Sequence, residues 1–112
     1  ATVYDNLGGE YGAKGLQDLA IENYQKALKI RLKILGPEHA LVADTCNLIG
    51  VQYGGKGRHD LAIENYEKAL EIRPDYAEAH GNLGTLFIGQ GEHEQALAAL
   101  KRGVFPMDLI VT

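Results

Sequence analysis

Apolar and polar residues alternate with helical periodicity in two stretches of nearly the same sequence. Residues 18–28 read DLAIENYQKAL and residues 60–70 read DLAIENYEKAL, so ten of the eleven positions agree. In each copy, two alanines, a tyrosine and a leucine recur at steps of four, three and one, which places them along one face of a helix. Such a helix cannot cover its apolar face alone. A chain that repeats it is expected to stack the copies.

The periodicity predicts six helices. They span residues 2–14, 16–35, 38–55, 61–73, 76–89 and 94–102. Gly15, Gly57 and Gly91 stand between the helices of each pair, where glycine suits the left-handed residue that ends a helix. Gly36-Pro37 and Pro74 end the second helices. The pattern therefore predicts one all-α domain over residues 1–112, with three stacked helix-turn-helix units at about 1–36, 37–74 and 75–106 and an apolar tail at 104–112.

The three units share one internal register. Gly15 and Gly57 are 42 residues apart, whereas Gly57 and Gly91 are 34 apart. Two spacings with the same internal pattern indicate an insertion of eight residues in the first unit. It falls at residues 28–35 and is expected to lengthen the second helix by about two turns.

These residues resemble the tetratricopeptide repeat family, whose 34-residue unit carries the motif W-x2-L-G-x2-Y, then A-x3-F, then P. The longer first unit, with ALKIRLKILGPEHALVAD across its junction, resembles the repeats of kinesin light chains. The resemblance implies a right-handed α-solenoid that binds protein partners, without enzymatic activity or a cofactor. The motif is met at Tyr4, Leu7, Gly8, Tyr11, Ala20 and Tyr24, again at Cys46, Ile49, Gly50, Tyr53, Ala62, Tyr66 and Pro74, and more weakly at His80, Leu83, Gly84, Phe87, Ala96, Leu100 and Pro106.

The resemblance implies that the first helices line a concave groove that binds a peptide. Asn47 falls where repeats like those of kinesin light chains place an asparagine facing the peptide, and an amide can bond both the N–H and the C=O of an extended backbone. Glycines outside the motif, Gly9 and Gly81, indicate either loosened helices or room for a ligand. The groove positions carried over are Asp5, Gly9, Asp44, Asn47, Val51, Glu78, Gly81, Thr85 and Ile88.

Acidic residues give the predicted groove a negative character. The groove positions include Asp5, Asp44 and Glu78 but no lysine or arginine. Basic residues such as Arg73 belong to second helices, which are expected to form the outer surface. A neutral or basic segment is therefore the expected partner. The alternative is that the three carboxylates are solvated charges favoured near helix N-termini.

Other chemistry finds little support. The net charge of −4 argues against non-specific nucleic-acid binding, serine is absent, and no apolar run reaches the roughly 18 residues of a membrane span. Cys46 is expected to be a buried packing residue. His59 and His93 occupy equivalent sites and could approach each other, but no Cys/His cluster has zinc spacing, so no metal site is expected.

A second class of function stays open. The repeat ends carry no polar capping helix, so the chain could be a structural element that self-assembles into a homo-oligomer through these ends. The near identity of the two copies also allows an engineered scaffold, against which the irregular glycines argue. No signal peptide is visible, but the first residue is Ala1 and not Met, so an excised or processed fragment stays open and the sequence does not indicate targeting. A cytoplasmic location is the default expectation, although no residue specifies it.

Overall fold

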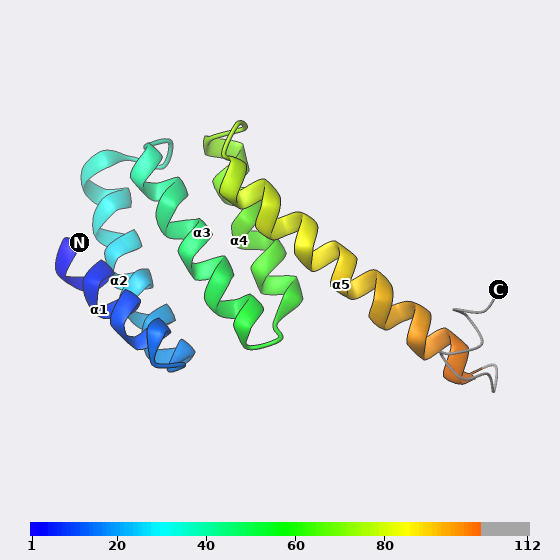
Figure 1. Ribbon diagram of the computed structural model, residues 1–112. Coiled ribbons are helices and arrows are strands. Elements are labelled where there is room, and N and C mark those ends of the chain that lie inside the picture. Colours follow the sequence, from blue (N-terminus) through cyan, green and yellow to red (C-terminus); the bar gives the residue numbers. More distant parts are fainter. Residues whose placement is uncertain (102–112) are drawn as a thin grey trace.

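A computed structural model describes the backbone of residues 1–101 and the side chains of residues 1–89 (Figure 1). Residues 1–101 contain helices and no strand. Two antiparallel hairpins, α1–α2 and α3–α4, stand side by side and α5 follows them (Figure 1). The predicted all-α solenoid is confirmed. The helices are α1 (Thr2–Ala13), α2 (Gln17–Leu35), α3 (Ala40–Gly55), α4 (His59–Ile72) and α5 (Ala77–Lys101).

The two hairpin turns have the same geometry. Gly15 and Gly57 both have φ +78°, the left-handed conformation that an L side chain rarely adopts. The residue after each glycine donates its backbone N–H to the carbonyl of a tyrosine in the preceding helix, from Leu16 to Tyr11 and from Arg58 to Tyr53, both at 2.9 Å. The predicted role of the two glycines is confirmed.

Close approach of a tyrosine to a glycine holds each hairpin together. A Cβ added to Gly8 would lie 2.7 Å from the ring of Tyr24, and one added to Gly50 would lie 2.6 Å from the ring of Tyr66. Both rings are buried, and the motif alanines beside them are fully buried. The glycine of the motif therefore opens the space that the tyrosine fills.

The second helix of the first hairpin is longer than that of the second, as predicted. α2 ends at Leu35, five residues beyond Ile30, which is equivalent to the end of α4 at Ile72. Gly36, with φ +87°, then ends the helix. α3 packs against both α2 and α4, so the first four helices form a continuous stack.

The prediction of a third hairpin was wrong at its turn. Gly91 lies inside α5, which runs without interruption from Ala77 to Lys101, and two separate helices at 76–89 and 94–102 do not form. α5 packs mainly on α4, and its second half extends away from the other helices (Figure 1). The residues after Gly91 include strong helix formers, EQALAAL, which favour continuation of the helix. The predicted tail at 104–112 lies outside the described residues.

Candidate functional site

The nine positions predicted to contact a peptide lie on α1, α3 and α5, the helices that begin the three repeats. We call them the groove face. Gly9, Val51 and Thr85, which share one row of the register, are all exposed. Outside the backbone of its own helix, no described atom lies within 4 Å of a Cβ added to Gly81, so that position is open. Glu78 and Ile88 are also exposed. In contrast, Asp5 and Asp44 are half-buried and Asn47 is buried.

Two of the three groove carboxylates are already paired. Asp5 accepts hydrogen bonds from both terminal nitrogens of Arg31, one of them 2.9 Å long. Asp44 accepts a hydrogen bond of 3.0 Å from Arg73. The expectation that Arg73 belongs to the outer surface was therefore wrong, because its side chain reaches back to α3. In the described part of the chain, Glu78 is the groove carboxylate with no ion pair.

Arg31 is the more buried of the two arginines and joins three helices. It lies in the extension of α2, is 9% exposed, and bonds Asp5 of α1 and the hydroxyl of Thr45 in α3. Thr45 in turn donates to the carbonyl of Leu41 at 2.8 Å. Our sequence reasoning missed this residue. The signal was present, because Arg31 and Arg73 are separated by the same 42 residues as the first two turn glycines.

Arg73 forms a half-exposed cluster at the start of α5. Its guanidinium lies 4.3 Å from the ring centroid of Tyr76, a cation–π distance. Burial, a hydrogen bond to Asp44 and the charge of Glu78 raise the pKa of Tyr76 to about 12. The single hydroxyl proton of this phenol is therefore engaged with Asp44, and Tyr76 belongs to the same polar cluster as Arg73.

Asn47 does not lie open to solvent. Its side chain is 1% exposed, and its Oδ1 accepts a hydrogen bond of 3.1 Å from Nδ2 of Asn82 in α5. Among the described residues its own Nδ2 has no hydrogen-bond partner although it is buried, which is costly for a polar group. Asn47 thus offers an unused donor at the contact between α3 and α5, and a ligand can reach it only if Asn82 moves aside.

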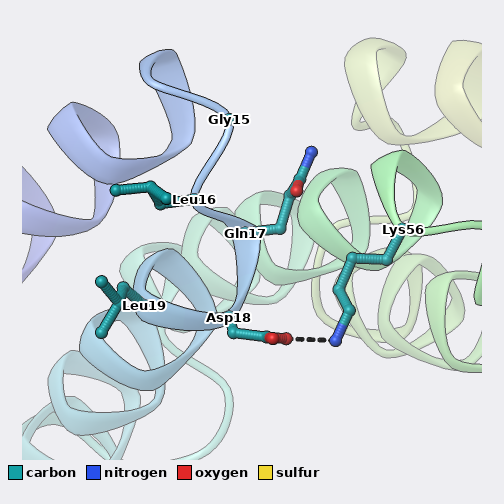
Figure 2. Close-up of a pocket in the computed structure, with 6 residues that line it drawn as sticks. All are labelled: Gly15, Leu16, Gln17, Asp18, Leu19 and Lys56. Carbon is teal, nitrogen blue, oxygen red and sulfur yellow. Dashed lines mark hydrogen bonds and ion pairs between the residues drawn. The ribbon is translucent and has the colours of Figure 1, made fainter.

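A hollow separate from the groove face lies at the edge where the hairpin turns meet (Figure 2). Its lining residues come from the α1–α2 turn, the start of α2 and Lys56. Lys56 follows α3 and pairs with Asp18 in the first turn of α2, which ties one hairpin to the other. Leu16 and Leu19, which also line it, are 45% and 41% exposed.

Cys46 is a packing residue, as predicted. It is 4% exposed in a cluster with Val42, Ala43, Ala69 and Ala79. Burial raises the pKa of its thiol, although Lys68 opposes the shift. Among the described side chains, no group of three or more His, Cys, Asp and Glu residues could hold a metal ion. The side chain of His93 lies outside the described residues, so its approach to His59 is not described.

This architecture defines an α-helical repeat protein whose first helices present one shared face. Two family models, both described as Tetratricopeptide repeat, match residues 1–75 and residues 55–105. The chain therefore belongs to the tetratricopeptide repeat family, whose members are typically non-enzymatic modules that mediate protein–protein interactions. A search of curated proteins found no match. Within the described residues, no helix has both the length and the apolar character that crossing a bilayer requires. The resemblance to kinesin light chains stays a prediction.

Proposed function

We propose that the groove face binds an extended peptide segment of a protein partner. The observation that carries the proposal is the exposed row Gly9, Val51 and Thr85, which runs across α1, α3 and α5. The motif positions Gly8 of α1 and Ile49 and Gly50 of α3 are instead buried. Small residues in the exposed row leave room for a backbone, and Val51 offers an apolar contact. Binding of this kind needs no catalytic group.

The preferred segment is neutral or carries a basic residue that lies beside Glu78. Asp5 and Asp44 contribute little net field, because Arg31 and Arg73 neutralise them. The charge preference is therefore smaller than three free carboxylates would produce. An exposed ion pair is worth about 0.2–1 kcal/mol, so one basic residue beside Glu78 improves affinity by up to about fivefold at low salt.

Asn47 supplies a further contact when Asn82 moves. The buried Nδ2 of Asn47 lacks an acceptor, and the carbonyl of a peptide is a suitable one. Because α5 packs on α3 over a small contact, displacement of Asn82 is expected to require little rearrangement. Asn82→Ala should then strengthen peptide binding or leave it unchanged, whereas Asn47→Ala should weaken it.

The test is titration of a labelled library of short peptides, followed by fluorescence anisotropy at two salt concentrations. For a basic peptide that binds, Glu78→Gln should reduce affinity by up to about fivefold. Glu67→Gln is the matched control, because Glu67 is exposed on α4 and glutamine already stands at its equivalent, Gln25. Equal loss from both variants, or a preference for acidic peptides, would contradict the proposed placement of the ligand.

Self-assembly is a second candidate function. Large apolar side chains are exposed at both ends of the stack, Val3 in α1 and Ile88 in α5, each at 68%. Exposed apolar surface of this kind tends to mark an interaction site. The two candidates are separable, because peptide binding follows peptide concentration and self-assembly follows the concentration of the chain alone.

A further inference from the structure

The straight helix α5 separates two positions that the repeat pattern pairs. In both formed hairpins, the motif glycine receives a tyrosine sixteen residues later, as Gly50 receives Tyr66. Gly84 and Leu100 have the same spacing in the third repeat. Within one straight helix they are about 24 Å apart, at 1.5 Å per residue. Gly84 therefore cannot meet Leu100 of its own chain while α5 is continuous.

The face of α5 around Gly84 lacks the helix that the other repeats have there. A Cβ added to Gly84 would meet no described atom within 4 Å, in contrast to 2.6 Å at Gly50. Phe87 and Ile88 are 51% and 68% exposed. Figure 1 shows that the second half of α5 projects beyond the hairpins instead of folding back on this face. Within the described residues, the third repeat of a single chain is therefore incomplete.

We propose that two copies of this chain exchange the second halves of α5 and form a two-fold antiparallel dimer. Residues 92–101 of each copy then lie beside residues 77–89 of the other, and Leu100 of each copy meets Gly84 of the other. The occupant is a second copy because the segment whose motif fits this face, Ala96 and Leu100, is the chain's own. Exchange of an identical element is a low-cost route to a symmetric dimer.

The hinge sequence favours the exchange over closure within one chain. Lys56, which precedes the formed turn at Gly57, ties its hairpin to Asp18 of the hairpin before it. Gln90 stands at the equivalent position before Gly91, and an uncharged amide cannot make that ion pair. Short hinges that extend rather than turn promote exchange between copies. The proposal deepens the self-assembly candidate and does not depend on peptide binding.

Cross-linking tests the contact directly. The variant carries Gly84→Cys and Leu100→Cys, and it is treated with a short thiol-specific cross-linker at several protein concentrations. The swap of sizes, larger at 84 and smaller at 100, keeps the volume of the pair nearly constant. The unmodified chain is the control, because its Cys46 is buried. We expect a covalent dimer in the variant and none in the control.

Each other outcome overturns the proposal in a distinguishable way. A cross-link within one chain, with a monomer on a denaturing gel, would show that the third hairpin closes in the ordinary manner. The absence of any cross-link in a monomeric sample would show that α5 stays straight and unpartnered. Oligomers that form by sedimentation but give no 84–100 cross-link would show assembly through the repeat ends, without exchange of α5.

Variants of the hinge provide a second measurement. Alanine favours helix over glycine by about 1 kcal/mol, about fivefold in an equilibrium constant. Gly91→Ala should therefore disfavour a closed third hairpin by about fivefold and leave the cross-linked dimer intact, because α5 is continuous both in the single chain and in the proposed dimer. Insertion of Gly-Ser-Gly after Gly91 should allow closure within one chain and give a monomer whose 84–100 cross-link is intramolecular. A dimer that survives the insertion with intermolecular cross-links unchanged, or one weakened by Gly91→Ala, would contradict the hinge mechanism.

Discussion

Arg31 and Arg73 occupy equivalent positions but differ in burial, so replacing each by methionine compares the two environments. In the pair of Arg31 with Asp5, the two side chains are 10% and 23% exposed. In the pair of Arg73 with Asp44, they are 39% and 40% exposed. Methionine keeps most of the aliphatic volume of arginine and removes the charge. The change therefore isolates the loss of the ion pair from the loss of packing.

The expected cost is larger at Arg31. Removing one partner of a buried pair costs about 3–5 kcal/mol, because the other charge stays buried and unpaired. Since Asp5 keeps some contact with water, we expect a lower value, about 2–3 kcal/mol, for Arg31→Met. Thr45 adds no large penalty, because its hydroxyl still donates to Leu41. Arg73→Met loses an exposed pair and a cation–π contact, together about 1 kcal/mol.

Urea unfolding followed by helical circular dichroism measures the difference. With an m value of about 1.5 kcal/mol/M, the midpoint should fall by about 1.3–2 M for Arg31→Met and by about 0.7 M for Arg73→Met. Added salt should reduce the effect at Arg73 more than that at Arg31, since screening acts mainly on exposed pairs. The double variant Arg31→Met/Asp5→Leu should recover much of the loss. Equal midpoints for the two single variants would refute the assignment of Arg31 as a buried tie between helices.

Three further predictions concern the motif residues and the groove face. Gly50→Ala should destabilise the chain by about 1–2 kcal/mol, because the new Cβ would lie 2.6 Å from the ring of Tyr66. Gly84→Ala, which has open space around it, should instead stabilise dilute protein by about 1 kcal/mol. Thermal unfolding compares the two variants, and equal effects would contradict the difference in packing. Burial and the charge of Glu78 raise the pKa of Tyr66 to about 12. The stability that this phenol contributes is therefore present below its unfolded pKa of about 10 and is lost as the pH rises towards 12. Tyr66→Phe should unfold at a higher pH than the unmodified chain, and an unchanged midpoint of alkaline unfolding would exclude this cause. Asn47→Ala should cost about 1 kcal/mol or more in urea unfolding, because the residue is fully buried and bonded to Asn82; no loss would mean that the side chain lies in solvent.

The sequence by itself determined the helical class, the register of the repeats and the core of the two hairpins. The reason is that the residues involved act locally or recur at fixed spacing. Tyr24 and Tyr66 lie on a helical face with alanines, and Gly15 and Gly57 supply the left-handed conformation at the turns. The periodicity did not indicate the groove face, because the resemblance to the tetratricopeptide repeat family alone implied that peptide contacts lie on α1, α3 and α5.

The tertiary structure decided which of these signals prevail and how the groove charges are partnered. Gly91 matches the turn glycines in register, yet helix continuation prevails there, because a turn forms only when packing across the hairpin outweighs the local preference for helix. Arg31 and Arg73 reach their carboxylates across 26 and 29 residues of sequence, which no local pattern specifies. Asn47 became buried for the same reason, since the approach of Asn82 from α5 depends on how the helices stack.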